Sequence, residues 1–216
     1  MAGWKLRRGV YAITDPALLQ GDLLYERVEA ALQAGLSLLQ YRNKLASAEQ
    51  QLHEAQHLLR LCRSYDTPLL INDDPALCLA VGANGVHLGQ SDTTLKQARA
   101  LLGKDAIIGI TCHSDLDRAL RAETEGATYV AFGRFHPSST KPHAPHADAG
   151  ILPTAKARLG VPIVAIGGIN ADNGSPLVAA GADMLAVIHY LFAYPDVSER
   201  VRQLKQCFRT DTRACD

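Results

Sequence analysis

The sequence contains no long apolar run, and this absence excludes one class of protein at the outset. No stretch approaches the roughly 18 consecutive apolar residues that a membrane-spanning helix needs. The first eight residues include Lys5, Arg7 and Arg8, but no apolar segment follows them, so we expect no secretory signal. The sequence therefore predicts a protein without a membrane partner.

Paired cysteines are also missing. The chain has 5 cysteines, an odd number, and no two of them form a CxxC motif. Disulfide frameworks use even sets of cysteines, and the common zinc and redox motifs place two of them close together. The pattern is typical of free thiols and predicts a cytoplasmic protein.

Neither sign of charge is in excess. Lys and Arg total 22, as do Asp and Glu, which gives a formal net charge of +0. A broad basic surface for nucleic acid or anionic lipid is therefore not expected. Any anion must be bound by a local arrangement of side chains and backbone groups.

One structural unit recurs along the 216 residues: a helix-like segment, a glycine, and a short apolar strand. Glycine is well suited to the left-handed turn that ends a helix, so each copy predicts a change from helix to strand. The glycines are Gly35, Gly82, Gly103, Gly126, Gly160 and Gly181. Capping-box spacing predicts helix starts at Ser47 with Gln50, Thr94 with Gln97, and Ser114 with Asp117.

Eight strands are expected, each followed by a helix. Most are apolar throughout, as in a parallel sheet that is covered on both faces. They are Val10–Ile13, Leu38–Tyr41, Leu69–Ile71, Gly85–Leu88, Ile107–Ile110, Tyr129–Phe132, Ile163–Ile166 and Leu185–Ile188. We predict a single-domain (β/α)8 TIM barrel over residues 1–209, with a loose tail at 210–216. A doubly wound open sheet is the alternative, but no GxGxxG follows the first strand.

Charged and polar residues follow these strands at the end where barrel enzymes carry their active sites. Two acids, Asp73 and Asp92, are expected at one mouth with three cations, Arg42, Lys44 and Lys141. Simple charge balance would give ion pairs and no metal. Mg²⁺ held by a few carboxylates and by substrate phosphates explains the mixture better, with the cations contacting the remaining phosphate oxygens.

A long polar segment follows the sixth strand and continues to about Asp148. Its two serines, its threonine and Lys141 suit phosphate binding, although a solvated surface loop has a similar composition. The pair Gly167-Gly168 after the seventh strand is a second candidate for anion binding, or a plain tight turn. The histidines of the long segment, at 136, 143 and 146, match no common zinc-site spacing.

Five motifs in this order resemble the thiamine phosphate synthase family. They are QYRNK at 40–44, IND at 71–73, GVHLGQSD at 85–92, STKP at 139–142 and AIGGI at 165–169. The resemblance extends over residues 11–192, nearly the whole chain. It implies a transferase that joins an aminopyrimidine diphosphate to a thiazole phosphate, giving thiamine phosphate and pyrophosphate. The partners are then two small phosphorylated heterocycles, and homo-oligomer formation is left open.

The resemblance also implies roles for individual residues. Contacts to the pyrimidine diphosphate fall on Gln40, Tyr41, Arg42, Asn43, Lys44, Asn72, Thr111 and Lys141, of which Arg42, Lys44 and Lys141 stabilise the leaving group. Contacts to the thiazole phosphate fall on Ser138, Ser139, Thr140, Gly168, Ile188 and His189. Asp73 and Asp92 hold the Mg²⁺ cofactor.

The chain departs from the family pattern at three positions. Thr111 replaces a frequent serine and Ser138 a frequent threonine, and both changes keep the hydroxyl. His189 stands where serine is usual, so either the imidazole faces the phosphate or the backbone makes the contact. Two alternative functions remain at this level: a related barrel resembling thiazole tautomerases, which tend to lack the full diphosphate and metal set, and a non-catalytic protein that binds phosphate esters.

Overall fold

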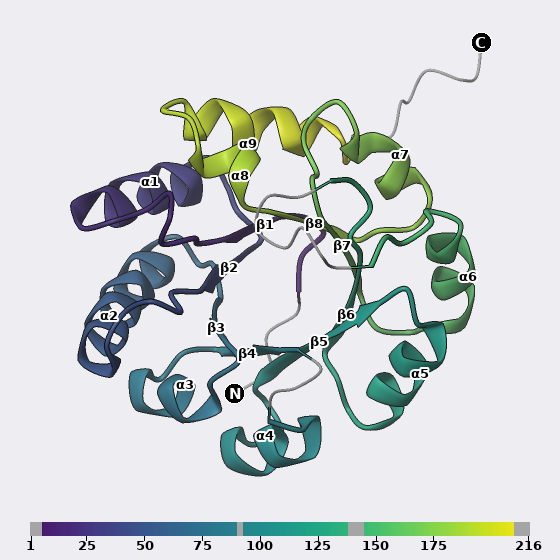
Figure 1. Ribbon diagram of the computed structural model, residues 1–216, viewed down its shortest axis with the longest axis horizontal. Helices are drawn as coiled ribbons and strands as arrows, with labels where there is room; N and C mark the ends of the chain where they lie inside the picture. Colours follow the sequence, from purple (N-terminus) through teal and green to yellow (C-terminus); the bar gives the residue numbers. More distant parts are fainter. Residues whose placement is uncertain (1–5, 90–92, 138–144, 210–216) are drawn as a thin grey trace.

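Eight parallel strands close into a barrel in the computed structural model, which describes residues 6–89, 93–137 and 145–209. The strands pair in sequence order, and β8 pairs with β1 to complete the ring. Helices surround this ring on the outside (Figure 1). The predicted single-domain (β/α)8 barrel is confirmed. The predicted tail at 210–216 lies outside the described residues.

Strands and helices alternate along the chain. The strands are β1 (Gly9–Ile13), β2 (Leu38–Tyr41), β3 (Leu69–Asn72), β4 (Gly85–Leu88), β5 (Ile107–His113), β6 (Tyr129–Phe132), β7 (Ile163–Ile166) and β8 (Met184–Val187). The helices are α1 (Asp22–Gln33), α2 (Ala48–Ser64), α3 (Pro75–Val81), α4 (Leu95–Leu102), α5 (Leu116–Thr124), α6 (Ile151–Arg158), α7 (Gly174–Ala179), α8 (His189–Phe192) and α9 (Val197–Gln206).

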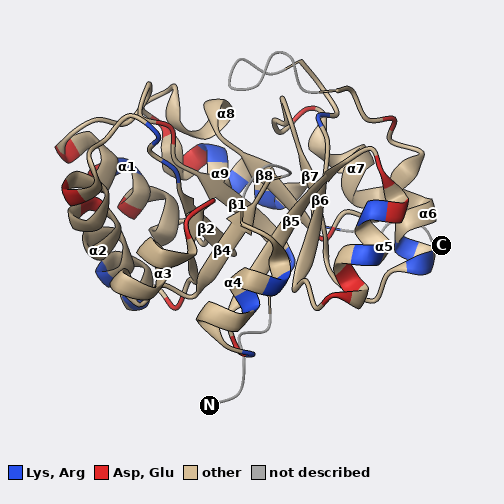
Figure 2. Ribbon diagram, turned by 60° about the horizontal axis from the view of Figure 1, so that its bottom comes forward, with Lys and Arg blue, Asp and Glu red and all other residues tan. Residues whose placement is uncertain are grey.

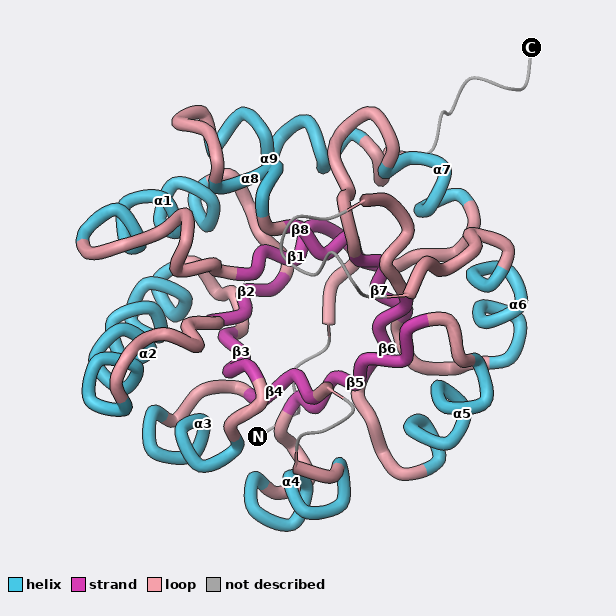
Figure 3. Tube along the Cα trace, in the orientation of Figure 1, coloured by secondary structure: helices cyan, strands magenta, loops and turns pink. Residues whose placement is uncertain are grey.

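The strands separate two cores, because successive side chains of a strand point to opposite faces. In β1, Val10 and Ala12 belong to the large core between strands and helices, whereas Tyr11 and Ile13 belong to a smaller core inside the barrel. Among the described residues, no strand contains Lys, Arg, Asp or Glu, so the charges in Figure 2 lie on helices and loops. The tube view shows the closed ring of strands within the ring of helices (Figure 3).

Four strands differ from their predicted bounds. β1 starts one residue early, at Gly9, and β3 ends one residue late, at Asn72. β5 continues to His113, three residues beyond the predicted end, with a register shift against β6 between Thr111 and His113. β8 starts and ends one residue early, and Ile188 is the residue that precedes helix α8. In β5, polar residues at the end of the apolar run continue the hydrogen-bonded ladder, whereas in β8 the ladder stops before the apolar Ile188.

The predicted helix starts are correct in two cases and wrong in one. Ser47 accepts a hydrogen bond from the Gln50 N–H, and Thr94 and Gln97 form a full capping box. The third cap is Asp115, which accepts from the Arg118 N–H at 2.8 Å, and not Ser114. The carboxylate takes the position because its residue is the one directly before the helix.

The predicted glycine turns hold with one exception. Gly35, Gly82, Gly103, Gly126 and Gly181 have positive φ, whereas Gly160 does not. The Gly160 N–H instead donates to Glu123 Oε1 at 2.7 Å, as the Val161 N–H does at 2.9 Å. A carboxylate from the preceding βα unit therefore holds this turn.

No helix in the described ranges is long and apolar enough to cross a bilayer.

Candidate active site

A cavity of about 340 Å³ lies at the carboxyl ends of the strands. Its volume is within the usual range for small-molecule sites, and its position is the one that barrel enzymes use. Every strand or the residue adjoining it contributes to the lining. From β1 to β8, contributors include Ile13, Gln40, Asn72, His87, Thr111, Ala131, Ile166 and Ala186.

Seven of the predicted site residues line this cavity. They are Gln40, Arg42, Asn72, Thr111, Gly168, Ile188 and His189. The set includes residues predicted for both substrates, so the structure brings the two predicted regions to one cavity. Asp92, the other predicted metal ligand, lies outside the described residues. So do residues 138–141, which carry all the contacts predicted for the long segment.

Tyr41 and Asn43 point elsewhere. The Tyr41 hydroxyl donates to Glu54 Oε2 at 2.7 Å, and the Asn43 amide donates to the same oxygen at 3.0 Å. Glu54, on α2, is 6 % exposed, and its Oε1 accepts from Gln50 at 2.7 Å. Burial and the Glu54 carboxylate raise the pKa of Tyr41, so the phenol keeps its proton. The geometry favours a supporting role for both residues behind the cavity wall.

The loop after β2 has its own internal scaffold. Asn43 Oδ1 accepts from the backbone N–H groups of Leu45 and Ala46, each at 3.2 Å. Gln51 donates to the Asn43 carbonyl at 2.7 Å. On the other side, Thr14 Oγ1 accepts from the Arg42 N–H at 2.8 Å. The backbone from which the Arg42 side chain extends is therefore fixed at both ends.

Asp73 follows β3 in a left-handed conformation, with φ of 62°. Such a φ is uncommon for a residue with a side chain and is found mostly at turns and functional sites. The chain can turn here because Asp74 caps helix α3 through the Leu77 N–H at 2.9 Å, with Pro75 in the first helical turn. The Asp73 N–H donates to the His87 carbonyl at 2.9 Å, which fixes the turn to β4.

The Asp73 carboxylate is ion-paired in the structure. Its Oδ2 lies 2.7 Å from Lys44 Nζ and accepts a 2.6 Å hydrogen bond from the Asn72 amide. The pairing joins one predicted cation to one predicted metal ligand, next to the cavity-lining Asn72. Charge balance, which from the sequence was the alternative to metal binding, is thus present for this pair.

The donor set of Asp73 nevertheless fits Mg²⁺. The side chain offers hard oxygen ligands and is only 23 % exposed. Within 6–89, 93–137 and 145–209, no group of three His, Cys, Asp or Glu residues could hold a metal ion. Mg²⁺ does not require such a cage, because it is usually bound by one or two carboxylates together with substrate phosphates and waters.

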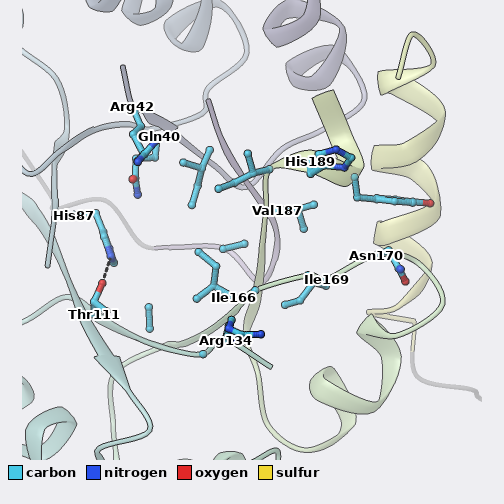
Figure 4. A pocket seen from close by; sticks show the side chains of 18 of the residues that line it. Gln40, Arg42, His87, Thr111, Arg134, Ile166, Ile169, Asn170, Val187 and His189 are labelled. Carbon is cyan, nitrogen blue, oxygen red and sulfur yellow. Dashed lines mark hydrogen bonds between the residues drawn. The ribbon is translucent and has the colours of Figure 1, made fainter. Parts of the chain in front are cut away.

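A chain of buried hydrogen bonds crosses the barrel interior below the cavity. Gln40 Nε2 donates to the Tyr11 hydroxyl, which lies 2.9 Å from the Tyr129 hydroxyl. The Tyr129 hydroxyl is 2.8 Å from His87 Nδ1, and His87 Nε2 is 2.8 Å from Thr111 Oγ1. Figure 4 shows the last bond in the cavity wall. Burial raises the pKa of both tyrosines, so both phenols stay protonated.

Backbone and glycine form the opposite wall, where the segment after β6 packs on the end of β7. The Phe135 and His136 N–H groups donate to the Ile166 and Gly167 carbonyls at 3.1 and 3.0 Å. A Cβ on Gly167 would lie 2.3 Å from Arg134 Cβ, and one on Gly168 would lie 2.3 Å from the Pro137 carbonyl oxygen. Both glycines are required because the two segments approach too closely for a side chain.

Aromatic residues complete the wall beside β8. His189 lies edge-on to Tyr194, with ring centroids 6.3 Å apart. The Arg200 guanidinium lies over the rings of Tyr194 and Tyr190, at 3.8 and 4.7 Å from their centroids. His189 therefore lines the cavity as part of an aromatic group (Figure 4). Ile188 lines it from the preceding position.

Several cavity residues were not among the predicted contacts. His113 is the last residue of β5, and Arg134 lies two residues beyond the end of β6, so the rule that strand ends carry the site could have found both. Tyr194 lies beyond α8 and carries no such signal. His136, one of the loop histidines, has a buried Nε2 without a hydrogen-bond partner among the described residues, whereas His143 lies outside them.

Comparison with known proteins gives consistent matches. The family model described as thiamine monophosphate synthase matches residues 10–191. A thiamine-phosphate synthase of Marinobacter nauticus is 52 % identical over 206 residues, covering 94 % of this chain and 92 % of the relative. One from Alcanivorax borkumensis is 49 % identical over 209 residues, covering 95 % and 96 %.

Among solved structures, the thiamine phosphate pyrophosphorylase of Pyrococcus furiosus is similar at a TM-score of 0.85 and 32 % identity. The match covers 94 % of this chain and 96 % of that one. The barrel is therefore shared with a protein of the activity that the sequence relatives are also named for.

Proposed function

The chain belongs to the thiamine monophosphate synthase family, and from that premise we propose the reaction that its cavity performs. As in its relatives, the activity is that of a transferase named thiamine-phosphate synthase. The proposed reaction joins 4-amino-5-hydroxymethyl-2-methylpyrimidine diphosphate to 4-methyl-5-(2-hydroxyethyl)thiazole phosphate. The products are thiamine phosphate and pyrophosphate.

The single observation that carries this proposal is the arrangement of the cavity wall. Side-chain donors that suit phosphate, namely Arg42, Asn72 and Thr111 on the β2–β5 side, line one cavity with the glycine wall after β7. A cavity with two different polar ends suits two phosphorylated substrates that must meet. The tautomerase-like alternative would not need the first set, and a non-catalytic binder does not fit a family of transferases.

In the proposed mechanism, the carbon–oxygen bond between the pyrimidine methylene group and the diphosphate breaks, and the electron pair leaves with pyrophosphate. The electron-rich aminopyrimidine carries the resulting positive charge, and the thiazole nitrogen then forms the new carbon–nitrogen bond. No protein nucleophile is needed. The protein contributes charge stabilisation on the leaving group and alignment of the second ring.

Arg42 and Lys44 have different parts in this step. The Arg42 guanidinium can contact two phosphate oxygens at once from a fixed backbone. Lys44, whose side chain is 56 % exposed, would exchange its contact with Asp73 for a phosphate oxygen as negative charge develops there. Lys141, in the segment outside the described residues, is proposed to act in the same way on the leaving group.

Mg²⁺ is proposed as the cofactor, held by Asp73 and Asp92, where it would neutralise negative charge on the diphosphate. The support is the oxygen donor set of Asp73 beside the cavity. We also propose a cytoplasmic location. It is supported by the buried free thiols of Cys62, Cys78, Cys112 and Cys207.

The test is an assay of pyrophosphate release with purified protein and both heterocyclic substrates. Release should require both substrates, should stop when Mg²⁺ is chelated, and should resume when Mg²⁺ is restored. No release with both substrates and Mg²⁺ present would refute the reaction. Full release after chelation would refute only the metal assignment.

A further inference from the structure

Five polar side chains inside the barrel form one continuous hydrogen-bonded chain, and its two ends line the cavity. Its members come from five different strands: Gln40 (β2), Tyr11 (β1), Tyr129 (β6), His87 (β4) and Thr111 (β5). Tyr11 and Tyr129 are 1 % and 0 % exposed. Neither tyrosine belongs to the cavity lining, so neither contacts a ligand directly.

The chemistry of the end groups gives the chain a direction. The Gln40 amide nitrogen can only donate, so the Tyr11 oxygen accepts from it. The Tyr11 proton is then directed to the Tyr129 oxygen, and the Tyr129 proton to His87 Nδ1. A neutral imidazole that accepts at Nδ1 carries its proton on Nε2, which donates to Thr111 Oγ1.

We infer that Tyr11 and Tyr129 are positioning residues, which fix His87 as the Nε2–H tautomer and thereby make the Thr111 hydroxyl a hydrogen-bond donor to the cavity. The Thr111 oxygen is occupied by the His87 proton, so its own proton is directed to a ligand. At the other end, the amide nitrogen of Gln40 is directed to Tyr11. The carbonyl oxygen of the same amide is therefore presented to the cavity.

This polarity matters because phosphate oxygens and the ring nitrogens of a pyrimidine accept hydrogen bonds but do not donate them. A Thr111 hydroxyl that donates suits these acceptors, and the Gln40 carbonyl suits the exocyclic amino group of an aminopyrimidine. The choice of this ligand rests on the proposed function. The direction of the chain rests only on the hydrogen bonds of the protein.

Packing holds the tyrosine rings in place independently of their hydroxyl groups. The Tyr11 and Tyr129 rings meet edge to face with centroids 6.0 Å apart, and His87 stacks on Tyr129 at 5.6 Å. A Cβ on Gly109 would lie 1.9 Å from Tyr129 Cζ, so the glycine is what admits this ring. Substitution of Tyr129 by Phe should therefore remove the hydroxyl and leave the ring where it is.

The first test is nitrogen NMR of the histidine side chains in the full chain without substrates. His87 should show a protonated Nε2 and an unprotonated Nδ1, and the assignment can be made with His87→Gln. In Tyr129→Phe the Nδ1 partner is gone, so the Nδ1–H form should become populated. A predominant Nδ1–H form in the unsubstituted protein would reverse the chain and overturn the inference.

The second test is a double-mutant cycle between Tyr129 and Thr111, which do not contact each other directly. We expect Tyr129→Phe to raise KM for the pyrimidine substrate about tenfold, the equivalent of one hydrogen bond. Thr111→Val should produce a similar or larger rise. In the double variant the Phe substitution should add no further rise, because its effect passes through Thr111.

Tyr65→Phe is the matched control. Its hydroxyl donates to Glu29 on the outer surface at 3.2 Å, and its loss should leave both KM and the His87 signals unchanged. Independent, additive effects of Tyr129→Phe and Thr111→Val would overturn the inference. The NMR test needs no turnover, so it stands even if the proposed reaction is wrong. A wrong reaction would be recognised separately, by the absence of pyrophosphate release.

Discussion

The two sides of the cavity are built in different ways. On the β2–β5 side, side chains supply the polar groups: Gln40, Arg42, Asn72 and Thr111 line the cavity. A hydrogen-bonded chain lies behind Gln40 and Thr111. On the β7–β8 side, the wall is mainly glycine backbone, apolar side chains and a group of aromatic rings around Arg200, with Asn170 as its polar side chain. One side offers specific donors and charges, whereas the other offers close approach and shape.

This difference determines which substitutions each side should tolerate. Side-chain donors can be removed without moving the backbone, so losses on the β2–β5 side should appear as lost charge or hydrogen bonding. The glycine wall has no side chain to remove, and it can be damaged only by adding atoms. The predictions below test this contrast in order of expected effect.

Asp73→Ala should have the largest effect, because the proposed metal ligand and the partner of Lys44 are removed together. We expect a loss in turnover of at least about 10³-fold, roughly 4 kcal/mol in the activation free energy. Steady-state pyrophosphate release at saturating substrates, repeated over a range of Mg²⁺ concentrations, measures it. Circular dichroism should show an unchanged fold.

Asp105→Asn is the control for Asp73→Ala, because Asp105 lies in an exposed turn before β5. Its kinetics should match those of the unsubstituted protein. If Asp73→Ala kept normal turnover at low Mg²⁺, the carboxylate would have no part in catalysis, and the contrast between the two sides would lose its main support.

Gly168→Ala should damage the backbone side. Gly168 has φ of 62°, and the added Cβ would lie 2.3 Å from the Pro137 carbonyl oxygen and 2.8 Å from His136 Cβ. The β6 and β7 segments must then separate, and displacement of about 1 Å in a site can lower the rate by about 10². We expect that loss in kcat/KM for the thiazole substrate.

Gly82→Ala separates backbone strain from the collision. Gly82 has φ of 73°, but no heavy atom of the described residues lies within 4 Å of the position that a Cβ would take there. The substitution should lower the free energy of unfolding by about 1 kcal/mol and leave kinetics unchanged. Equal kinetic losses in the two variants would show that the close approach at Gly168 is not what matters.

The β2–β5 side should also set the alkaline limit of stability. Burial raises the pKa of Cys62 (α2), Cys78 (α3) and Cys112 (β5) to about 12. An unfolded thiol has a pKa near 8.5, so from about pH 9 to 12 the unfolded chain loses protons that the folded chain keeps. The free energy of unfolding should fall as pH rises, by up to about 1.4 kcal/mol per pH unit for each thiol.

Urea midpoints between pH 8 and pH 11 measure this decline. Tyr11 and Tyr129, whose pKa values are also raised by burial, act in the same direction above about pH 10. Cys62→Ala should make the slope shallower by the share of one thiol. A midpoint that does not change up to pH 11 would contradict the prediction.

His189→Ser should have the smallest effect. The substitution restores the residue usual at this position and removes the edge-on contact with Tyr194, which is worth about 0.5–1.5 kcal/mol. We expect a thermal midpoint lower by a few degrees and a change in KM for the thiazole substrate of less than about fivefold. A loss of activity as large as that of Gly168→Ala would give the imidazole a direct role.

The barrel could be predicted from the sequence because its strands are short, mostly apolar and separated by glycine or capping residues. The errors in the predicted element bounds occur where polar residues continue or interrupt the apolar pattern of a strand. Thr111-Cys112-His113 extends β5 because the alternate side chains face the cavity and the ladder continues beneath them. His189 begins a helix and not a loop, which spacing alone did not indicate.

The candidate site was predictable where a side chain follows a strand directly. Motif positions do not show direction, however, and Tyr41 and Asn43 in the same motif as Gln40 and Arg42 turn toward Glu54. That outcome depends on a buried glutamate contributed by the next helix. Tyr194 is brought to the cavity only by the turn after α8, so no local pattern in the sequence could identify it.

The scaffolded loop after β2 provides a place to observe the enzyme without disturbing it. Leu45 is 83 % exposed, yet its N–H is held by Asn43, so its backbone is ordered while its side chain faces solvent. A fluorophore attached at this position, one residue beyond Lys44, would sit beside the proposed diphosphate end of the cavity. Its emission could then report each arrival and departure of a ligand in real time.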